Sequence, residues 1–551
     1  MTGNPEHSPS LDASWHAAIG EATGGLSPAA LATAWLDWSL HILASPEKCA
    51  ELLRLGVTPR TMDFFAERDK RFSDPAWSAL PYRQFAQAFL ATQDWWTNAT
   101  TGVGGVDPKN ADIVRFAARQ WLDMMSPANF AATNPIVMAR TQAEGGQNLV
   151  RGLRYWIEDF NRLVLKAERP HSEFRVGDTL ATTPGDVVLQ NELIELIRYH
   201  PTTEKVRPEP IVIVPAWIMK YYILDLTDER SLVRFLRDQG FEVYILSWKN
   251  PGTEDAKRTM QDYIDLGVRM AMDHVSGTGA KGIHAVGYCL GGTLATIAAA
   301  AMARDHDDRL ATLSLLASQV DFSDPGELGL FINESQVAFL EDMMAVNGYL
   351  RADQMAGAFR MLRPNDLIWS RVIRHYLLGE RTSMNALLAW NADATRMPAA
   401  MHSEYLRRLF LDNDLAKGRF PVDGAPVALT DIRCPIYSIG TEKDHVAPWQ
   451  SVYRLLLLSD TDVTFVLTNG GHNGGILSEP GHPNRQFRVR HKKEGGKFET
   501  ADAWFEQEKV QDGSWWPHWS AWLENKSGAP IRPRLSPTTQ LGKAPGHYVL
   551  G

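Results

Sequence analysis

Between residues 176 and 317, short apolar runs alternate with helical segments, and this alternation constrains the fold more than any other feature of the chain. Residues 210–215 form a fully apolar run, which is typical of a buried parallel strand, and residues 241–247 read as a second strand. Residues 231–239 and 260–275 have helical patterns. Strands that alternate with helices in this way predict βαβ units and a mainly parallel sheet.

The alternation continues with a strand at residues 282–287 and an Ala-rich helix at residues 294–303. It then stops, and strand patterns return only at residues 434–440 and 463–467. The interruption, at about residues 321–431, is helical and loop-like and rich in Met and aromatic residues. An insertion of this size between strands of one sheet is typical of a cap over the active-site end. The alternative is a separate domain with no gating role.

The first part of the chain has a different character. We expect a disordered tail over residues 1–12 and a helical N-terminal domain over residues 13–175, followed by an α/β domain over residues 176–551. In residues 29–43 apolar side chains recur at helical spacing, namely at Leu31, Trp35, Trp38 and Ile42. Near the other end of the chain a helix is expected with four of the 18 tryptophans, namely Trp515, Trp516, Trp519 and Trp522.

The composition is that of a globular protein and limits the classes of function. Of the 551 residues, 44% are apolar and 22% are charged, and the net charge of −9 argues against a general nucleic-acid binder. Three cysteines are too few for a disulfide framework and indicate a reducing, intracellular location. A glycine-rich turn breaks the longest charge-free stretch, residues 285–303, so no transmembrane segment is expected. Because the N-terminus is polar and lacks an apolar stretch, we expect no signal peptide.

The strand at residues 282–287 leads into Gly287-Tyr-Cys-Leu-Gly-Gly292, which has the pattern of a nucleophile elbow with Cys289 in place of the usual serine. Its glycines permit a sharp turn that lifts the side chain above the edge of the sheet. The N-terminus of the following helix favours a thiolate there. The alternative is a glycine-rich turn with a buried structural cysteine, which is also how we interpret Cys49 and Cys434.

Two later loops carry the acid and the base that an acyl-transfer site needs. Asp444 comes directly after the strand at residues 434–440, and His472 comes directly after the strand at residues 463–467. Both lie at carboxyl ends of strands and follow Cys289 in the order nucleophile, acid, histidine that α/β-hydrolases use. We therefore predict an α/β-hydrolase fold, with a helical cap insertion, in which Cys289, Asp444 and His472 are catalytic.

The remaining site residues are expected from the position of the elbow. The backbone N–H of Leu290 is predicted to form the oxyanion hole together with the N–H of Ile218, in the loop after the strand that ends at Pro215. His445 is a rival for His472, but adjacent loop residues seldom face each other, so we expect His445 in a supporting position. Neither a metal site nor a bound cofactor is expected, because the metal-ligand and phosphate-loop motifs are missing.

These residues and their neighbours resemble the polyhydroxyalkanoate synthase family of the single-subunit, class I/II kind. Matching motifs run in family order from about residue 71 to the C-terminus: Arg71-Phe-Ser-Asp-Pro-Ala-Trp77, Ser126-Pro-Ala-Asn-Phe130, Gly145-Gly-Gln-Asn-Leu149, Lys220-Tyr-Tyr-Ile-Leu-Asp-Leu226, Ser247-Trp-Lys-Asn-Pro251, Trp390-Asn-Ala-Asp-Ala-Thr-Arg-Met-Pro398, Asp444-His445 and Gly546-His-Tyr-Val-Leu550. The family's nucleophile, aspartate and histidine fall on Cys289, Asp444 and His472. Departures at Met219 and around His472 leave class and acyl chain length open.

The resemblance implies that the chain polymerises (R)-3-hydroxyacyl-CoA, such as 3-hydroxybutyryl-CoA, into a polyester and releases CoA, through an acyl-Cys289 thioester. CoA would enter as part of the substrate and not as a bound cofactor. The implied partners are the growing polyester, the surface of polyhydroxyalkanoate granules in the cytoplasm, and a second copy of the chain in a homodimer. The helical N-terminal domain would either contact such partners or only support the α/β domain.

Two other functions remain open from the residues alone. One is a thioesterase or polyester depolymerase on the same fold. Such enzymes mostly carry serine in the elbow, and their reaction does not require a helical N-terminal half. The other is a non-catalytic protein of the granule surface. A synthase differs from a thioesterase chiefly by excluding water, and the aromatic insertion could provide a dry cover, although ordinary core packing predicts the same residues.

Overall fold

The computed structural model describes residues 10–23, 25–57, 69–165, 173–362, 365–381, 383–534 and 541–551. The chain divides into two compact units. The α/β unit contains Met1–Ile19, Glu173–Met355 and Asn385–Gly551, and the helical unit contains Gly20–Ser172 and Ala356–Met384. Of the tail expected over residues 1–12, residues 1–9 lie outside the described residues, and helix α1 begins at Leu11 (Leu11–Thr23).

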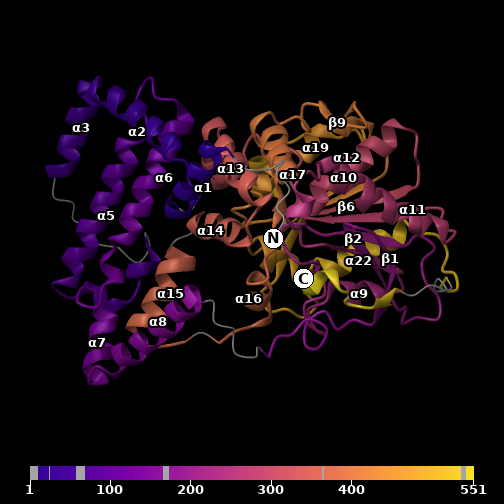
Figure 1. Cartoon of the computed structure of the whole chain (residues 1–551), viewed down its shortest axis with the longest axis horizontal. Helices are drawn as coiled ribbons and strands as arrows, with labels where there is room; N and C mark the ends of the chain where they lie inside the picture. Colours follow the sequence, from indigo (N-terminus) through magenta and orange to yellow (C-terminus); the bar gives the residue numbers. More distant parts are fainter. Residues whose placement is uncertain are drawn as a thin grey trace. The chain divides into compact units, whose positions relative to one another are not determined.

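Within the described residues, the α/β unit is built on an eleven-stranded sheet in the order β14-β13-β12-β11-β6-β5-β3-β4-β2-β1-β15 (Figure 1). Its strands are β1 (Gly185–Gln190), β2 (Ile194–Tyr199), β3 (Ile211–Val214), β4 (Val243–Trp248), β5 (Ile283–Tyr288), β6 (Leu310–Leu316), β11 (Ile436–Thr441), β12 (Val463–Thr468), β13 (Gln486–Lys492), β14 (Gln511–Asp512) and β15 (Gly542–Lys543). The central strands from β12 to β4 are parallel, and their flanking neighbours β13 and β2 are antiparallel. The predicted mainly parallel sheet is confirmed.

The apolar runs of the sequence form the centre of this sheet. All four residues of β3 are fully buried, because helices cover both faces of the parallel strands. Helix α12, which follows β5, lies on one face, and α9 and α22 lie on the other (Figure 1). The helices of this unit include α9 (Leu232–Asp238), α10 (Met260–Asp262), η6 (Tyr263–Arg269), α11 (Met270–Gly277), α12 (Leu290–Arg304), α13 (Glu334–Asn347), α16 (Ala386–Asn391), α17 (Ala399–Glu404), η10 (Tyr405–Leu411), α18 (Trp449–Tyr453), α19 (Leu455–Leu458), α20 (His472–Ile476), α21 (Ala501–Gln507) and α22 (Trp516–Asn525).

The helical unit has a separate core around the buried side chains of Phe72, Trp77 and Phe89. Its helices include α2 (Pro28–Leu43), α3 (Pro46–Val57), α5 (Tyr82–Ala99), α6 (Pro108–Met124), α7 (Pro135–Ala143), α8 (Gln147–Leu165), α15 (Ser370–Val372) and η9 (Ile373–Leu377). Helices α2, α6 and α7 each begin with a polar cap residue followed by proline at the first helical position. The N–H of the first helical residue has no hydrogen-bond partner within the helix. Proline suits this position because it has no N–H.

Part of the stretch expected to be a cap belongs to the helical unit. Residues 356–384 join it, and η9 packs closely on α8. A Cβ at Gly152 of α8 would lie only 1.9 Å from the carbonyl oxygen of Tyr376, so only glycine allows this approach. The amide of Asn148 also donates to the carbonyl of Leu377 over 2.8 Å. The rest of the interruption, up to Met355 and from Asn385 onward, belongs to the α/β unit.

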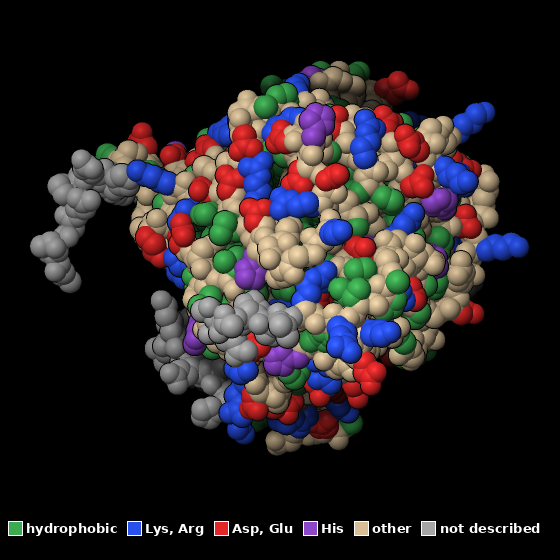
Figure 2. Space-filling view, turned by 90° about the vertical axis from the view of Figure 1, so that its right-hand side faces the viewer, with side chains coloured by type: hydrophobic (Ala, Val, Ile, Leu, Met, Phe, Trp, Pro, Cys, Tyr) green, Lys and Arg blue, Asp and Glu red, His purple; other side chains and the backbone are tan. Residues whose placement is uncertain are grey.

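Two surface features bear on the partners of the chain. On the face that Figure 2 shows, Lys and Arg side chains are interspersed with Asp and Glu side chains, in keeping with the small net charge for a chain of this length. Among the described residues, we find no helix with both the length and the apolar character needed to cross a bilayer.

Candidate active site

Cys289 sits at a sharp turn between β5 and α12. Its backbone has φ 53° and ψ −126°, outside the conformations that a non-glycine residue usually adopts. Such a conformation costs on the order of 1–3 kcal/mol and persists only where the surroundings impose it. The side chain is 8% exposed. A strained, nearly buried cysteine at the carboxyl end of a central strand is the geometry of a nucleophile elbow.

The three glycines of the elbow are sterically required. A Cβ at Gly287 would lie 2.2 Å from Cα of Gly292, and a Cβ at Gly291 would lie 2.1 Å from the carbonyl oxygen of Val214 at the end of β3. A Cβ at Gly292 would lie 1.9 Å from Oγ of Ser318. The first turn of α12 therefore packs directly on β5 and on the loop after β3, which is the loop that carries Ile218.

Asp444 and His472 meet at the same edge of the sheet. Asp444 follows β11, and His472 is the first residue of α20, which follows β12. Nδ1 of His472 lies 2.7 Å from Oδ2 of Asp444. The Asp444 side chain is fully buried, and its other oxygen accepts the backbone N–H groups of Val446 and Ala447 over 2.9 Å each. The hydroxyl of Thr441 donates to Oδ2 over 2.9 Å, so the carboxylate is held from three sides.

The charges of the three groups reinforce one another. Burial alone would raise the pKa of Asp444, but the His472 imidazolium and the hydrogen bonds to the carboxylate lower it below its usual value. Burial likewise would lower the pKa of His472, but the Asp444 carboxylate, the Cys289 thiolate and hydrogen bonds to both raise it well above its usual value. The arrangement therefore favours a protonated imidazole beside the Asp444 carboxylate, which is the form of His472 that follows proton transfer from a nucleophile.

Residues that the sequence analysis did not single out complete this part of the site. The hydroxyl of Tyr288, the neighbour of Cys289, donates to the side-chain oxygen of Asn473 over 2.6 Å, and the ring of Tyr288 lies 5.8 Å from that of His472. The elbow and α20 are thereby linked directly. Their positions in the sequence could have indicated them, because Tyr288 adjoins Cys289 and Asn473 adjoins His472.

The two neighbouring histidines occupy different places. His472 bonds to the Asp444 carboxylate, whereas His445 follows Asp444 on the loop between β11 and α18, and its carbonyl oxygen lies near Gly326. The other cysteines lie outside this constellation. Burial raises the pKa of Cys434 to about 12, which keeps that thiol protonated. The thiol of Cys49 donates to the carbonyl of Ile42 over 3.1 Å in the helical unit.

The loop expected to provide the second oxyanion donor is held by α16 and by the segment that follows it. The hydroxyl of Thr395 donates to the carbonyl of Trp217 over 2.7 Å, and the indole of Trp390 donates to the carbonyl of Lys220 over 2.7 Å. In a trans peptide the N–H of one residue points opposite to the preceding carbonyl. The N–H of Ile218 therefore points away from Thr395. Leu290 begins α12, where an N–H has no partner within the helix.

Aromatic side chains from the interruption pack against this loop. Tyr405 begins the π-helix η10 and is buried against Trp217, with 6.1 Å between ring centroids, and against Phe322, with 6.4 Å. Burial, together with the nearby negative charge of Cys289, raises the pKa of the Tyr405 hydroxyl well above its usual value. The hydroxyl thus stays protonated close to the nucleophile.

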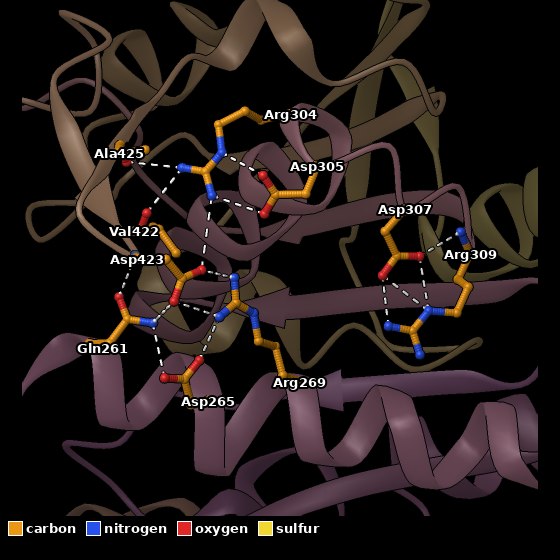
Figure 3. Close-up of polar contacts among 10 residues, drawn as sticks. All are labelled: Gln261, Asp265, Arg269, Arg304, Asp305, Asp307, Arg309, Val422, Asp423 and Ala425. Carbon is orange, nitrogen blue, oxygen red and sulfur yellow. Dashed lines mark hydrogen bonds and ion pairs between the residues drawn. The ribbon is translucent and has the colours of Figure 1, made fainter.

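The far end of α12 is anchored as well (Figure 3). Arg304, its last residue, donates to the carbonyls of Val422 and Ala425 over 3.0 and 2.9 Å. These residues belong to the hairpin of β9 (Phe420–Val422) and β10 (Ala425–Val427). At the tip of the hairpin, Asp423 pairs with Arg269 of η6 over 2.5 Å. The helix that carries the elbow is therefore held at both ends.

Family models match most of the chain. Residues 68–236 match a model described as the N-terminus of poly-beta-hydroxybutyrate polymerase (PhaC), and residues 6–48 match a second model described as poly-beta-hydroxybutyrate polymerase N terminal. Residues 209–477 match the alpha/beta hydrolase fold. The α/β-hydrolase fold predicted from the sequence is confirmed by this match and by the observed sheet.

Curated relatives match over nearly the same span. The poly(3-hydroxyalkanoate) polymerase subunit PhaC of Rhizobium meliloti is 37% identical over 488 residues, which cover 87% of this chain and 79% of the relative. The subunit of the same name from Cupriavidus necator is 37% identical, over 87% of this chain and 83% of the relative. Among solved structures, a monoacylglycerol lipase of Paleococcus ferrophilus is 13% identical with a TM-score of 0.32, over 51% of this chain and 91% of the lipase.

Proposed function

The chain belongs to the poly(3-hydroxyalkanoate) polymerase family, and from this premise we propose that it polymerises (R)-3-hydroxyacyl-CoA into polyester and releases CoA through a thioester on Cys289. The observation that carries the proposal is the hydrogen bond between His472 and the buried Asp444, together with the electrostatic interaction of Cys289 with His472 that helps to raise the pKa of the imidazole. CoA is the leaving part of the substrate, and the proposal needs no further cofactor.

In the first half-reaction the Cys289 thiol gives its proton to Nε2 of His472, since Nδ1 is held by Asp444. The sulfur attacks the thioester carbonyl, and the N–H groups of Leu290 and Ile218 stabilise the oxyanion. The carbon–sulfur bond to CoA then breaks, and His472 returns the proton to the departing CoA thiolate. A 3-hydroxyacyl group is left on Cys289, with the proton count unchanged.

In the second half-reaction the hydroxyl of another hydroxyacyl unit attacks the acyl group on Cys289. His472 takes the hydroxyl proton, the ester bond forms, and the Cys289 sulfur leaves and regains a proton from the imidazolium. Asp444 stabilises the imidazolium in both halves and fixes the orientation of the ring. The acyl group thus passes from a sulfur of CoA to an oxygen of the polymer.

Polymerisation requires that this hydroxyl outcompete water. The buried position of Cys289 and the aromatic side chains of Trp217, Phe322 and Tyr405 support a dry acyl-enzyme. The family membership supports the same reading over a thioesterase or depolymerase. We assign a supporting role to His445, on the loop that carries Asp444.

We further propose that the enzyme works as a homodimer at the surface of polyester granules in the cytoplasm. Helix α8 supports an apolar contact, because five of its apolar side chains are between 45% and 61% exposed: Val150, Leu153, Trp156, Ile157 and Phe160. Replacing Leu153, Trp156 and Phe160 with serine should release the protein from polyhydroxybutyrate particles while its CoA release is retained. Unchanged particle binding would contradict this contact.

The test of the function itself is an incubation with 3-hydroxybutyryl-CoA and with longer hydroxyacyl-CoA thioesters. We expect release of CoA together with insoluble polyester, and neither product from Cys289→Ala. Release of CoA with soluble 3-hydroxy acid would instead identify a thioesterase. A wild-type rate of CoA release in Cys289→Ala would identify a protein without catalysis at this site.

A further inference from the structure

The helix that carries His472 is very short. Helix α20 runs from His472 to Ile476, only five residues. The last four carbonyl groups of a helix have no partners within it, so a helix of this length cannot hold its own direction through backbone bonds alone. The carbonyl oxygens of its last three residues, Gly474, Gly475 and Ile476, are bound by side chains from two other segments.

Arg485 holds the loop on both sides of the histidine. Its Nη1 donates to the carbonyl of Asn469 over 3.4 Å, before His472, and its Nη2 donates to the carbonyls of Gly474 and Leu477, the latter over 3.1 Å. Arg485 directly precedes β13, so the sheet fixes the backbone that carries this guanidinium. A planar group with several donors in fixed directions is suited to holding carbonyls at both ends of a turn.

Two adjacent tryptophans bind the carbonyls in between. The indole N–H of Trp515 donates to the carbonyl of Gly475 over 3.0 Å, and that of Trp516 donates to the carbonyl of Ile476 over 2.9 Å. Both tryptophans are at most 1% exposed at the start of α22. A buried indole N–H needs a partner, and here successive indoles meet successive carbonyls. The four carbonyls from residue 474 to residue 477 are therefore all bound by side chains.

On its other side α20 is joined to the elbow through Asn473 and Tyr288. The helix is thus held between the residue next to the nucleophile and the three donors Arg485, Trp515 and Trp516. We propose that these three are positioning residues for His472: by binding four successive carbonyls they fix the axis of α20, and with it the direction in which the imidazole faces Cys289. This inference rests on the proposed role of His472 as the base.

The geometry of a catalytic base is demanding, since a misplacement of about 1 Å can lower a rate by roughly 10²-fold. Replacing Trp515 and Trp516 together with phenylalanine keeps two aromatic rings but removes both N–H donors. Trp519→Phe is the matched control. Trp519 is equally buried in the same helix, but its indole donates to the Ser314 hydroxyl on β6, over 3.0 Å, and not to α20.

Two readouts are measured on each variant. The first is the steady-state rate of CoA release from 3-hydroxybutyryl-CoA. The second is the pH dependence of alkylation of Cys289 by iodoacetamide, followed on the peptide that contains this residue. Because a displaced His472 no longer accepts the thiol proton, we expect the double variant to lose about tenfold or more in kcat. We also expect KM to stay within about twofold and the alkylation profile to move to higher pH.

Trp519→Phe should lower thermal stability but keep both readouts close to wild type. The proposal is overturned if the folded double variant has the wild-type alkylation profile, or if Trp519→Phe shifts the profile equally. If the double variant does not fold, Arg485→Lys replaces it under the same criteria. This substitution keeps the positive charge but removes the planar guanidinium with its several donors. If the wild type releases no CoA from any hydroxyacyl-CoA, the proposed function fails, while the alkylation profiles still decide the positioning role.

Discussion

Nδ1 of His472 lies 2.7 Å from Oδ2 of Asp444, although the two residues are separated by 27 others in the sequence. They meet because β11 and β12 are adjacent parallel strands in register, so the loops that follow them leave the sheet at the same edge. With Nδ1 bound to a buried carboxylate, Nε2 is the nitrogen free to exchange a proton with Cys289. The pair therefore orients the base that both halves of the proposed reaction need.

Asp444→Asn should remove most of the catalytic activity, because it disturbs the orientation and tautomer of His472. An amide can donate to Nδ1 and so favour the wrong tautomer of His472, and comparable substitutions lower kcat by about 10⁴-fold. We expect a loss of about 10³-fold or more in CoA release, measured under saturating substrate. Glu442→Gln is the control on the same loop, because Glu442 pairs with Arg488 instead of His472. A loss of less than about tenfold in Asp444→Asn would contradict the assigned role.

Thr395→Val tests the oxyanion loop. The hydroxyl of Thr395 holds the carbonyl of Trp217 and so aims the N–H of Ile218. Its removal should lower kcat by about tenfold while KM is unchanged, since an oxyanion donor acts in the transition state. Thr461→Val serves as the control, because this buried hydroxyl donates to the carbonyls of Arg433 and Cys434 instead. Equal effects of the two substitutions would argue against Ile218 as a donor.

Two neighbouring glycines of α20 should respond very differently to alanine. A Cβ at Gly475 would lie 2.5 Å from Cγ2 of Thr441, the residue that also holds the Asp444 carboxylate, whereas a Cβ at Gly474 meets nothing within 4 Å. Gly475→Ala should therefore displace α20 and lower CoA release by about 10²-fold. Gly474→Ala should remain within about twofold of wild type. The prediction fails if both variants have the same activity.

The stability of the α/β unit should fall in mild acid because of two buried neutral histidines. Burial lowers the pKa of His284 and of His402 to about 4. The usual value is about 6.5, so between these values the unfolded chain takes up protons that the folded chain excludes. Stability is then full above about pH 6.5 and is lost as the pH falls toward 4, by roughly 3 kcal/mol for each histidine.

Urea unfolding of His402→Leu checks this prediction. The variant places an apolar side chain in the buried position, and this side chain cannot take up a proton. Its unfolding midpoint should fall less steeply than that of wild type between about pH 7 and about pH 4.5. Parallel curves for the two proteins would show that His402 does not contribute to acid unfolding.

Much of the site was predictable because parallel strands carry a strong local signal. The apolar runs that became β5, β11 and β12 located Cys289, Asp444 and His472 at strand ends, and the structure brings the last two into hydrogen-bond contact. The strand β13 has no such signal. It is an antiparallel strand near the edge with only two apolar residues, Phe487 and Val489, among basic and partly exposed side chains, so its alternation is too short to separate it from a loop.

Contacts between distant segments could not be predicted in the same way. The sequence shows a cluster of tryptophans at residues 515–522, but nothing local indicates that the first two bind carbonyls some 40 positions earlier. The assignment of residues 356–384 to the helical unit is a similar case. It depends on the missing Cβ of Gly152 on another helix, and one glycine in a helical pattern does not reveal what approaches it.

The central claim is that the polymer grows on Cys289, and trapping the acyl-enzyme tests it most directly. The protein is mixed with 3-hydroxybutyryl-CoA, quenched in acid after less than one turnover, and digested for mass spectrometry. We predict that the peptide containing Cys289 carries one or more 3-hydroxybutyryl units, that hydroxylamine removes them, and that Cys289→Ala shows none. Polyester formation by the wild type with this peptide unmodified, or its formation by Cys289→Ala, would contradict the account.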